Sequence, residues 1–225
     1  MKTGKLILVL GGFTIFVLCS SCSRSQKTPG TTELMEEDAF TGPTITDQPE
    51  AYFHLAEEAF THKNYKESAD ALDAAVRLME DISKGAGPED KQAIDNSIAE
   101  IRDLSSDVAV DKVDGIRELT FFTGKAFLTL ARYRLNATRE FMLKDMVPEA
   151  ADHLNQAILN YHTANQYHGA ELTAEEKVAT KELEGIAKKL ENGVAVDQEE
   201  VDRVFSQFET ALARLKANSY EDLSL

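Results

Sequence analysis

The spacing of the apolar residues between Ala51 and Leu225 constrains the fold of this chain more than any other feature. These residues recur at steps of three and four, as Leu72, Val76 and Met79 do, and this spacing gathers them on one face of an α-helix. No window alternates polar and apolar residues as a half-buried strand does. Because each helix must cover its apolar stripe against a neighbour, the sequence predicts an all-α fold of about seven to eight helices.

Turn and capping residues divide this region into successive helices. A Gly-Ala-Gly run at 85–87 ends one helix, and Pro88 begins the next, where its missing N–H would have no helical partner anyway. Thr173 is followed three residues later by Glu176, the pattern of a capping box, which predicts another helix start. A long segment at 111–144 contains no proline, so we expect one long helix there.

An offset of 82 residues superimposes two parts of this region. It places Ala69, Leu72, Ala75 and Val76 onto Ala151, Leu154, Ala157 and Ile158. We therefore predict two copies of one bundle-like unit, with halves of about 51–124 and 125–217 that share the long helix. Gly115 and Gly124 are the points at which that helix would bend. A chance alignment of amphipathic helices is the alternative interpretation.

Two of the expected helical hairpins resemble tetratricopeptide units. In the first, the large, small and turn positions of that family are occupied by Tyr52, Leu55, Ala56, Ala59, Asn64, Tyr65, Ser68, Leu72 and Ala75. The second hairpin keeps this spacing with Ala137, Thr138, Phe141, Ala150, Leu154 and Ala157. The family stacks its units directly, with a period of about 34 residues, whereas these hairpins lie 82 residues apart. The resemblance implies a helical surface that binds protein or peptide.

The N-terminus carries the features of an export signal. Lys2 and Lys5 precede an apolar run from Leu6 to Leu18, which is too short to span a membrane as a helix. Small residues then lead to Cys22. This pattern resembles a bacterial lipoprotein signal peptide, which implies removal of residues 1–21 and lipidation of Cys22. An ordinary secretory signal with a chance cysteine is the alternative.

A tether is expected between the lipid and the folded domain. Residues 22–50 are rich in Ser, Thr, Gly, Pro and acidic residues, and contain too little apolar material to form a core. The segment at 34–40 could alternatively form a short amphipathic turn that docks on a partner or on the domain at 51–225. Because Ser23 stands where an inner-membrane retention signal has Asp in enteric-type lipoproteins, the resemblance implies attachment to the outer membrane, facing the periplasm.

The charge and cysteine content exclude several classes of function. The sequence has 24 Lys and Arg against 39 Asp and Glu, a formal charge of −15, and cleavage of the signal would remove two lysines and give −17. Such a charge disfavours nucleic acid and anionic lipid headgroups as partners. Cys19 and Cys22 are the only cysteines, so the predicted domain has no disulfide and no thiol nucleophile. The acidic surface is explained by solubility or by a basic partner.

Histidines are the best candidates for chemistry. His54, Glu58 and His62 follow one another at four-residue intervals on the first expected helix, a stripe that could hold a divalent metal. The alternative is that these residues flank the apolar stripe at its border with solvent. The sequence contains no Gly-rich phosphate loop, no Gly-x-Ser-x-Gly elbow and no His-Glu-x-x-His pattern. We therefore expect no catalytic activity and no cofactor.

The leading hypothesis is a lipid-anchored helical-repeat protein of the cell envelope that serves as a binding scaffold. It would attach to the membrane through the N-terminal lipid and bind another envelope protein or a peptide through its helix faces. The second hypothesis is an envelope bundle that binds a divalent metal or a small ligand through His54, Glu58 and His62.

Overall fold

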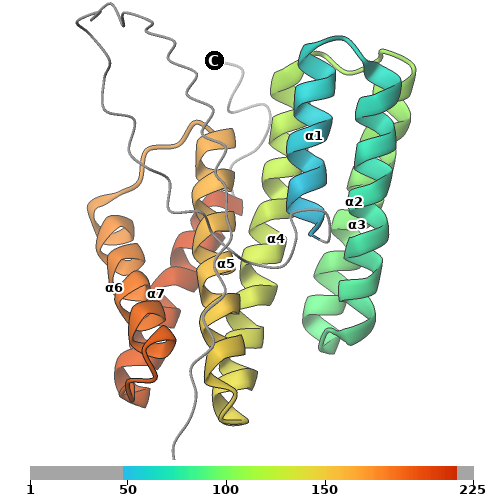
Figure 1. The fold of residues 1–225 in the computed structure, drawn as a ribbon. Helices are drawn as coiled ribbons and strands as arrows, with labels where there is room; N and C mark the ends of the chain where they lie inside the picture. The colour runs from blue at the N-terminus through green and yellow to red at the C-terminus, as the bar shows by residue number, and fades with distance from the viewer. Residues whose placement is uncertain (1–47, 217–225) are drawn as a thin grey trace, which may run out of the picture. The chain divides into compact units, whose positions relative to one another are not determined.

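The computed structural model describes residues 48–216, so the predicted signal peptide, the lipid acceptor Cys22 and most of the predicted tether lie outside the described residues. Within this range the chain forms seven α-helices and no strand, which confirms the predicted all-α class (Figure 1). The helices are α1 (Pro49–Thr61), α2 (Tyr65–Gly85), α3 (Pro88–Ala109), α4 (Ile116–Leu143), α5 (Val147–Tyr167), α6 (Ala174–Glu191) and α7 (Gln198–Lys216). None of these seven is both long and apolar enough to cross a membrane.

The starts of several helices follow from local chemistry. Proline occupies a first-turn position in α1, α3 and α5. At the start of α6 the Glu176 N–H donates to the Thr173 hydroxyl at 3.2 Å, and the Thr173 N–H donates to the Glu176 carboxylate at 2.7 Å, so the predicted capping box is present. We expected Pro49 and Glu50 to belong to the tether, but α1 begins there because proline fits a first turn.

The long helix α4 begins later than predicted and is not interrupted. Gly115 precedes its first turn with a φ of 127°, a backbone conformation that glycine adopts readily. The helix then continues through Gly124, which the sequence marked as a weak point. A Cβ atom at Gly124 would lie 3.1 Å from His168 Nε2, so the missing side chain lets the end of α5 approach α4 closely.

Contacts between helices form two closed rings of four helices that share α4. In the first ring α1, α2, α3 and α4 pack in order, and α1 returns to contact α4. In the second ring α4, α5, α6 and α7 pack in order, and α7 also contacts α4. Figure 1 shows α4 between these two groups of helices. One continuous core passes through α4, with Phe53, Phe127 and Phe205 almost fully buried in it.

The ends of helices recur at an offset of 82 residues. Helices α2 and α5 cover 65–85 and 147–167, α1 and α4 end at Thr61 and Leu143, and α3 and α6 end at Ala109 and Glu191. The turns after α1 and α4 also match, because Lys63 and Asp145 both have positive φ, of 61° and 57°. This correspondence agrees with the predicted repeat. That the two halves are copies of one unit stays a prediction.

Candidate functional groove

The structure places His54, one of the three predicted metal ligands, in a different contact from Glu58 and His62. His54 is exposed on α1, and its Nδ1 atom lies 3.0 Å from the Tyr167 hydroxyl oxygen of α5. The His62 Nδ1 atom lies 2.8 Å from the carbonyl oxygen of Glu58, to which it donates. Within residues 48–216 no group of three or more His, Cys, Asp or Glu side chains could hold a metal ion. His54, Glu58 and His62 therefore do not form a ligand set in this structure.

Glu58 and His62 instead line a shallow hollow between α1 and α2. Its volume is about 430 Å³, and Tyr52 and Leu55 of α1 also line it. Leu55 is 51% exposed, although the resemblance to tetratricopeptide units gives this position a packing role. Ala56, by contrast, is fully buried, and the Ser68 hydroxyl of α2 donates to its carbonyl oxygen at 2.7 Å. Small residues thus do allow α1 and α2 to approach closely.

Tyr167 links α5 to α1 through a hydrogen bond. Its hydroxyl donates to the Glu57 carboxylate, and its ring packs edge-on against Phe127 of α4, with the ring centroids 5.7 Å apart. Burial, followed by the hydrogen bond to Glu57, raises the pKa of Tyr167 above its ordinary value, so the phenol remains a neutral donor at physiological pH. This contact joins the first ring to the second on the α1 side of α4.

A buried polar cluster strengthens the same junction. The Asn160 side-chain amide of α5 donates to Glu50 Oε1 at 2.8 Å, and the Arg134 guanidinium of α4 lies 3.9 Å from the same oxygen. Glu50 Oε2, Arg134 Nε and Asn160 Oδ1 are buried without a hydrogen-bond partner among the described residues. Since Glu50 is only 7% exposed, removal of Arg134 would leave a buried charge uncompensated.

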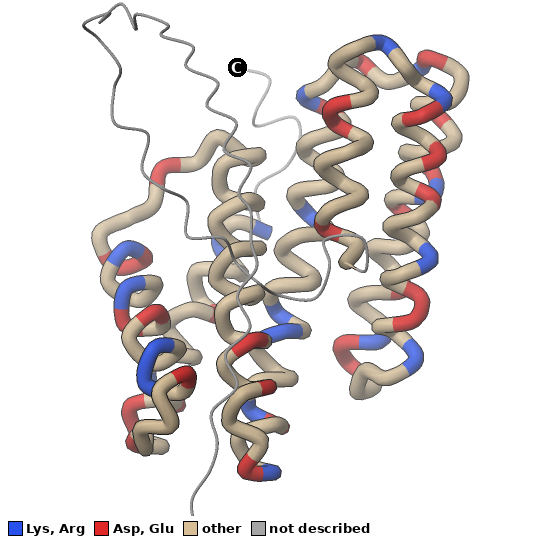
Figure 2. The backbone as a smooth tube through the Cα atoms, viewed as in Figure 1, with Lys and Arg blue, Asp and Glu red and all other residues tan. Residues whose placement is uncertain are grey.

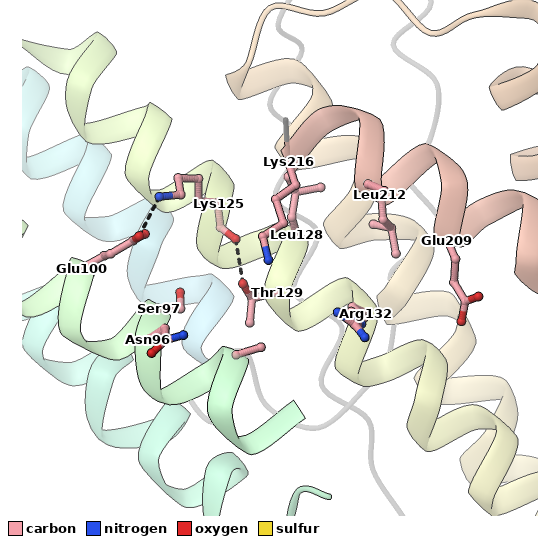
Figure 3. A pocket seen from close by; sticks show the side chains of 12 residues that line it. Asn96, Ser97, Glu100, Lys125, Leu128, Thr129, Arg132, Glu209, Leu212 and Lys216 are labelled. Atoms are coloured by element: carbon pink, nitrogen blue, oxygen red, sulfur yellow. Dashed lines mark hydrogen bonds and ion pairs between the residues drawn. The ribbon is translucent and has the colours of Figure 1, made fainter. Parts of the chain in front are cut away.

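On the other side of α4, a groove separates α3 from α7. It has a volume of about 490 Å³, and α4 forms its floor (Figure 3). The lining residues are Ala93, Asn96, Ser97 and Glu100 from α3, Lys125, Leu128, Thr129 and Arg132 from α4, and Glu209, Leu212, Ala213 and Lys216 from α7. Each helix contributes positions i, i+3, i+4 and i+7, which is one face over two turns. A rise of 1.5 Å per residue makes the groove about 10 Å long.

Ion pairs link α4 to the helices on both sides of this groove. Lys125 pairs with Glu100 of α3 at 2.7 Å, and Arg132 pairs with Glu89 of α3. Arg139 of α4 pairs with Glu209 of α7 at 2.7 Å. All three cations belong to α4, so the shared helix is tied to both neighbours by its own positive charges.

These ion pairs reflect how the charged residues are distributed among the described helices. Helix α4 carries five basic residues against two acidic ones, whereas each of the other six described helices contains more acidic than basic residues (Figure 2). A net positive helix is therefore placed where acidic helices surround it, and each pair gains modest Coulomb energy at these partly exposed positions.

None of the groove residues was singled out from the sequence as a site. Each row of four is an ordinary helical spacing, and α7 is far in the chain from the consecutive helices α3 and α4. The excess of basic residues within 116–143 is the one sequence signal that could have directed attention to α4.

The chain was compared with protein-family models, with curated proteins and with solved structures. None of the three comparisons gave a match.

Proposed function

We propose that this protein is a non-enzymatic, lipid-anchored binding scaffold of the bacterial cell envelope, and that the groove between α3, α4 and α7 binds an α-helical segment of another envelope protein. The groove is the single observation that supports the docking role. The lipoprotein-like N-terminus with Cys22 supports the anchor and the location at the outer membrane. The strongly acidic composition argues against nucleic acid as the partner.

The shape of the groove favours a helix as its occupant. Both rings in this fold contain four helices, whereas α3, α4 and α7 border the groove on three sides and no helix within residues 48–216 covers its fourth side. Small residues on the two walls, Ala93 and Ser97 on α3 and Ala213 on α7, leave room for close approach. Leu128 and Leu212 also line the groove, although they are only 5% and 6% exposed and so offer a partner a small apolar area. A helix laid in such a groove buries its apolar face along positions i, i+3, i+4 and i+7.

A photo-activated cross-linker placed in the groove tests this proposal. The full-length lipidated chain would carry the cross-linking residue at Asn96, which lines the groove, and would be irradiated in its native envelope. The matched control places it at Asp103, an exposed residue of the same helix that does not line the groove. We expect an adduct with another protein at Asn96 that is absent at Asp103. Equal labelling at both positions, or none, contradicts the proposal.

A substitution at the floor of the groove gives a second measurement. Leu128→Gln should reduce the yield of the adduct at Asn96 because it places a polar amide at the floor of the proposed interface. Since Leu128 is 5% exposed, the variant also needs a circular dichroism spectrum and a melting curve to show that it folds. A folded Leu128→Gln protein that gives the full yield of adduct would show that the partner binds elsewhere.

A further inference from the structure

We propose, building on the function above, that the helix which binds this groove carries carboxylates at both ends of its apolar contact face and recognises Lys216 and Arg132. The partner segment would then be an amphipathic helix with Asp or Glu about seven positions apart and apolar residues between them. Some polar groups around the groove already have partners, whereas others have none within residues 48–216.

The carboxylates of the groove are already paired. Glu100 is bound by Lys125 and Glu209 is bound by Arg139, in each case at 2.7 Å. These acidic residues therefore offer little attraction to a basic partner, although the chain as a whole has a charge of −15.

Hydrogen-bond donors remain available in the groove. Lys216 and the side chain of Asn96 make no hydrogen bond or ion pair within residues 48–216. Arg132 contacts Glu89 through one terminal nitrogen, Nη2, which leaves further N–H groups of its guanidinium for another acceptor. In Figure 3 Lys216 extends from α7 toward Leu128, whereas Arg132 lies on the side of Glu209. The available donors of Lys216 and Arg132 thus lie at separate places along the groove. Leu128 and Leu212 line the same groove.

Carboxylates on the partner helix complement this arrangement. A guanidinium donates two parallel hydrogen bonds to a carboxylate, and charge-assisted bonds of this kind are about twice as strong as neutral ones. Two helical turns separate the ends of the contact face, which corresponds to about seven residues on the partner as well. Because the whole chain is acidic, a partner helix of low net charge fits better than a strongly acidic one.

The test starts from the segment captured by the cross-linker. Cross-links from Asn96 and Ala213 in the full-length protein would be mapped by mass spectrometry, and the captured segment would be synthesised as a labelled peptide. Fluorescence anisotropy with the detergent-solubilised full chain then gives its Kd. We expect Lys216→Glu to raise the Kd about tenfold, and a Glu→Lys change in the peptide to restore binding to that variant. Lys181→Glu, the same charge change at an exposed position on α6, should leave the Kd unchanged.

Each outcome separates this inference from the proposed function. A captured segment without carboxylates at this spacing, or a Kd that Lys216→Glu leaves unchanged, overturns the inference while the docking role stands. A cross-link only to a second copy of this chain, or only within one chain, overturns both proposals. Acidic residues in the captured segment together with recovery of binding by the charge swap support both.

Discussion

At the scale of single residues, burial determines how two histidines respond to pH. The His153 ring stacks on Phe141 and lies 3.5 Å from an Arg134 nitrogen, and burial followed by this positive charge lowers its pKa to about 4. Burial, and then Lys125, also lowers the pKa of His168. The unfolded chain binds these protons near pH 6.5, so between about pH 6.5 and pH 4 it holds more protons than the folded chain. The contribution of these two histidines to the free energy of unfolding is therefore fully present above about pH 6.5 and is lost as the pH falls.

We expect His153→Gln to reduce this loss. Between pH 7 and pH 4 the free energy of unfolding of the variant should fall less than that of the wild type, by up to about 3 kcal/mol, because Gln takes up no proton. Urea unfolding curves at several pH values, recorded in parallel for both proteins, measure the difference. Parallel declines would mean that the imidazole can be protonated in the folded state without cost.

At the scale of elements, the turns after α1 and α4 carry strain that glycine would relieve. Lys63 and Asp145 occupy the left-handed region, which costs a residue with a side chain about 1–2 kcal/mol, and the turn after α6 has Gly193 in that conformation. We therefore expect Lys63→Gly and Asp145→Gly each to stabilise the protein by up to about 1 kcal/mol in urea titrations, after the entropy cost of glycine. Lys66→Gly, inside the first turn of α2, should be destabilising. A loss of stability at Lys63 similar to that at Lys66 contradicts this account.

At the scale of the whole molecule, the shared helix α4 should make the two rings unfold together. Leu72 of α2 and Leu154 of α5 are both fully buried, and each belongs to a different ring. Leu72→Ala and Leu154→Ala should each cost about 2–5 kcal/mol and still give one unfolding transition, with amide exchange in both rings accelerated by either change. Leu159→Ala, at a residue that is 56% exposed, should have little effect. Two separate transitions would show that each ring is stable alone.

Features that depend on neighbouring residues could be predicted from the sequence, whereas contacts between distant residues could not. Helix periodicity, the break around Gly87 and the capping box at Thr173 depend on residues within a few positions of one another, so the all-α class and most helix ends were accessible. The metal hypothesis also rested on local spacing. Local spacing does not reveal the contact between His54 and Tyr167, which is 113 residues away in the chain.

By itself, the sequence determined which segments become helices and which face of each must be covered, because backbone hydrogen bonds and apolar periodicity act within one or two turns. Only the tertiary structure decided which helices pair around α4 and where a gap remains. The groove depends on residues as distant as Ala93 and Lys216, and on ion pairs such as that between Arg139 and Glu209. Such contacts result from the joint packing of all the helices, and the spacing within any single helix is compatible with several ways of packing it.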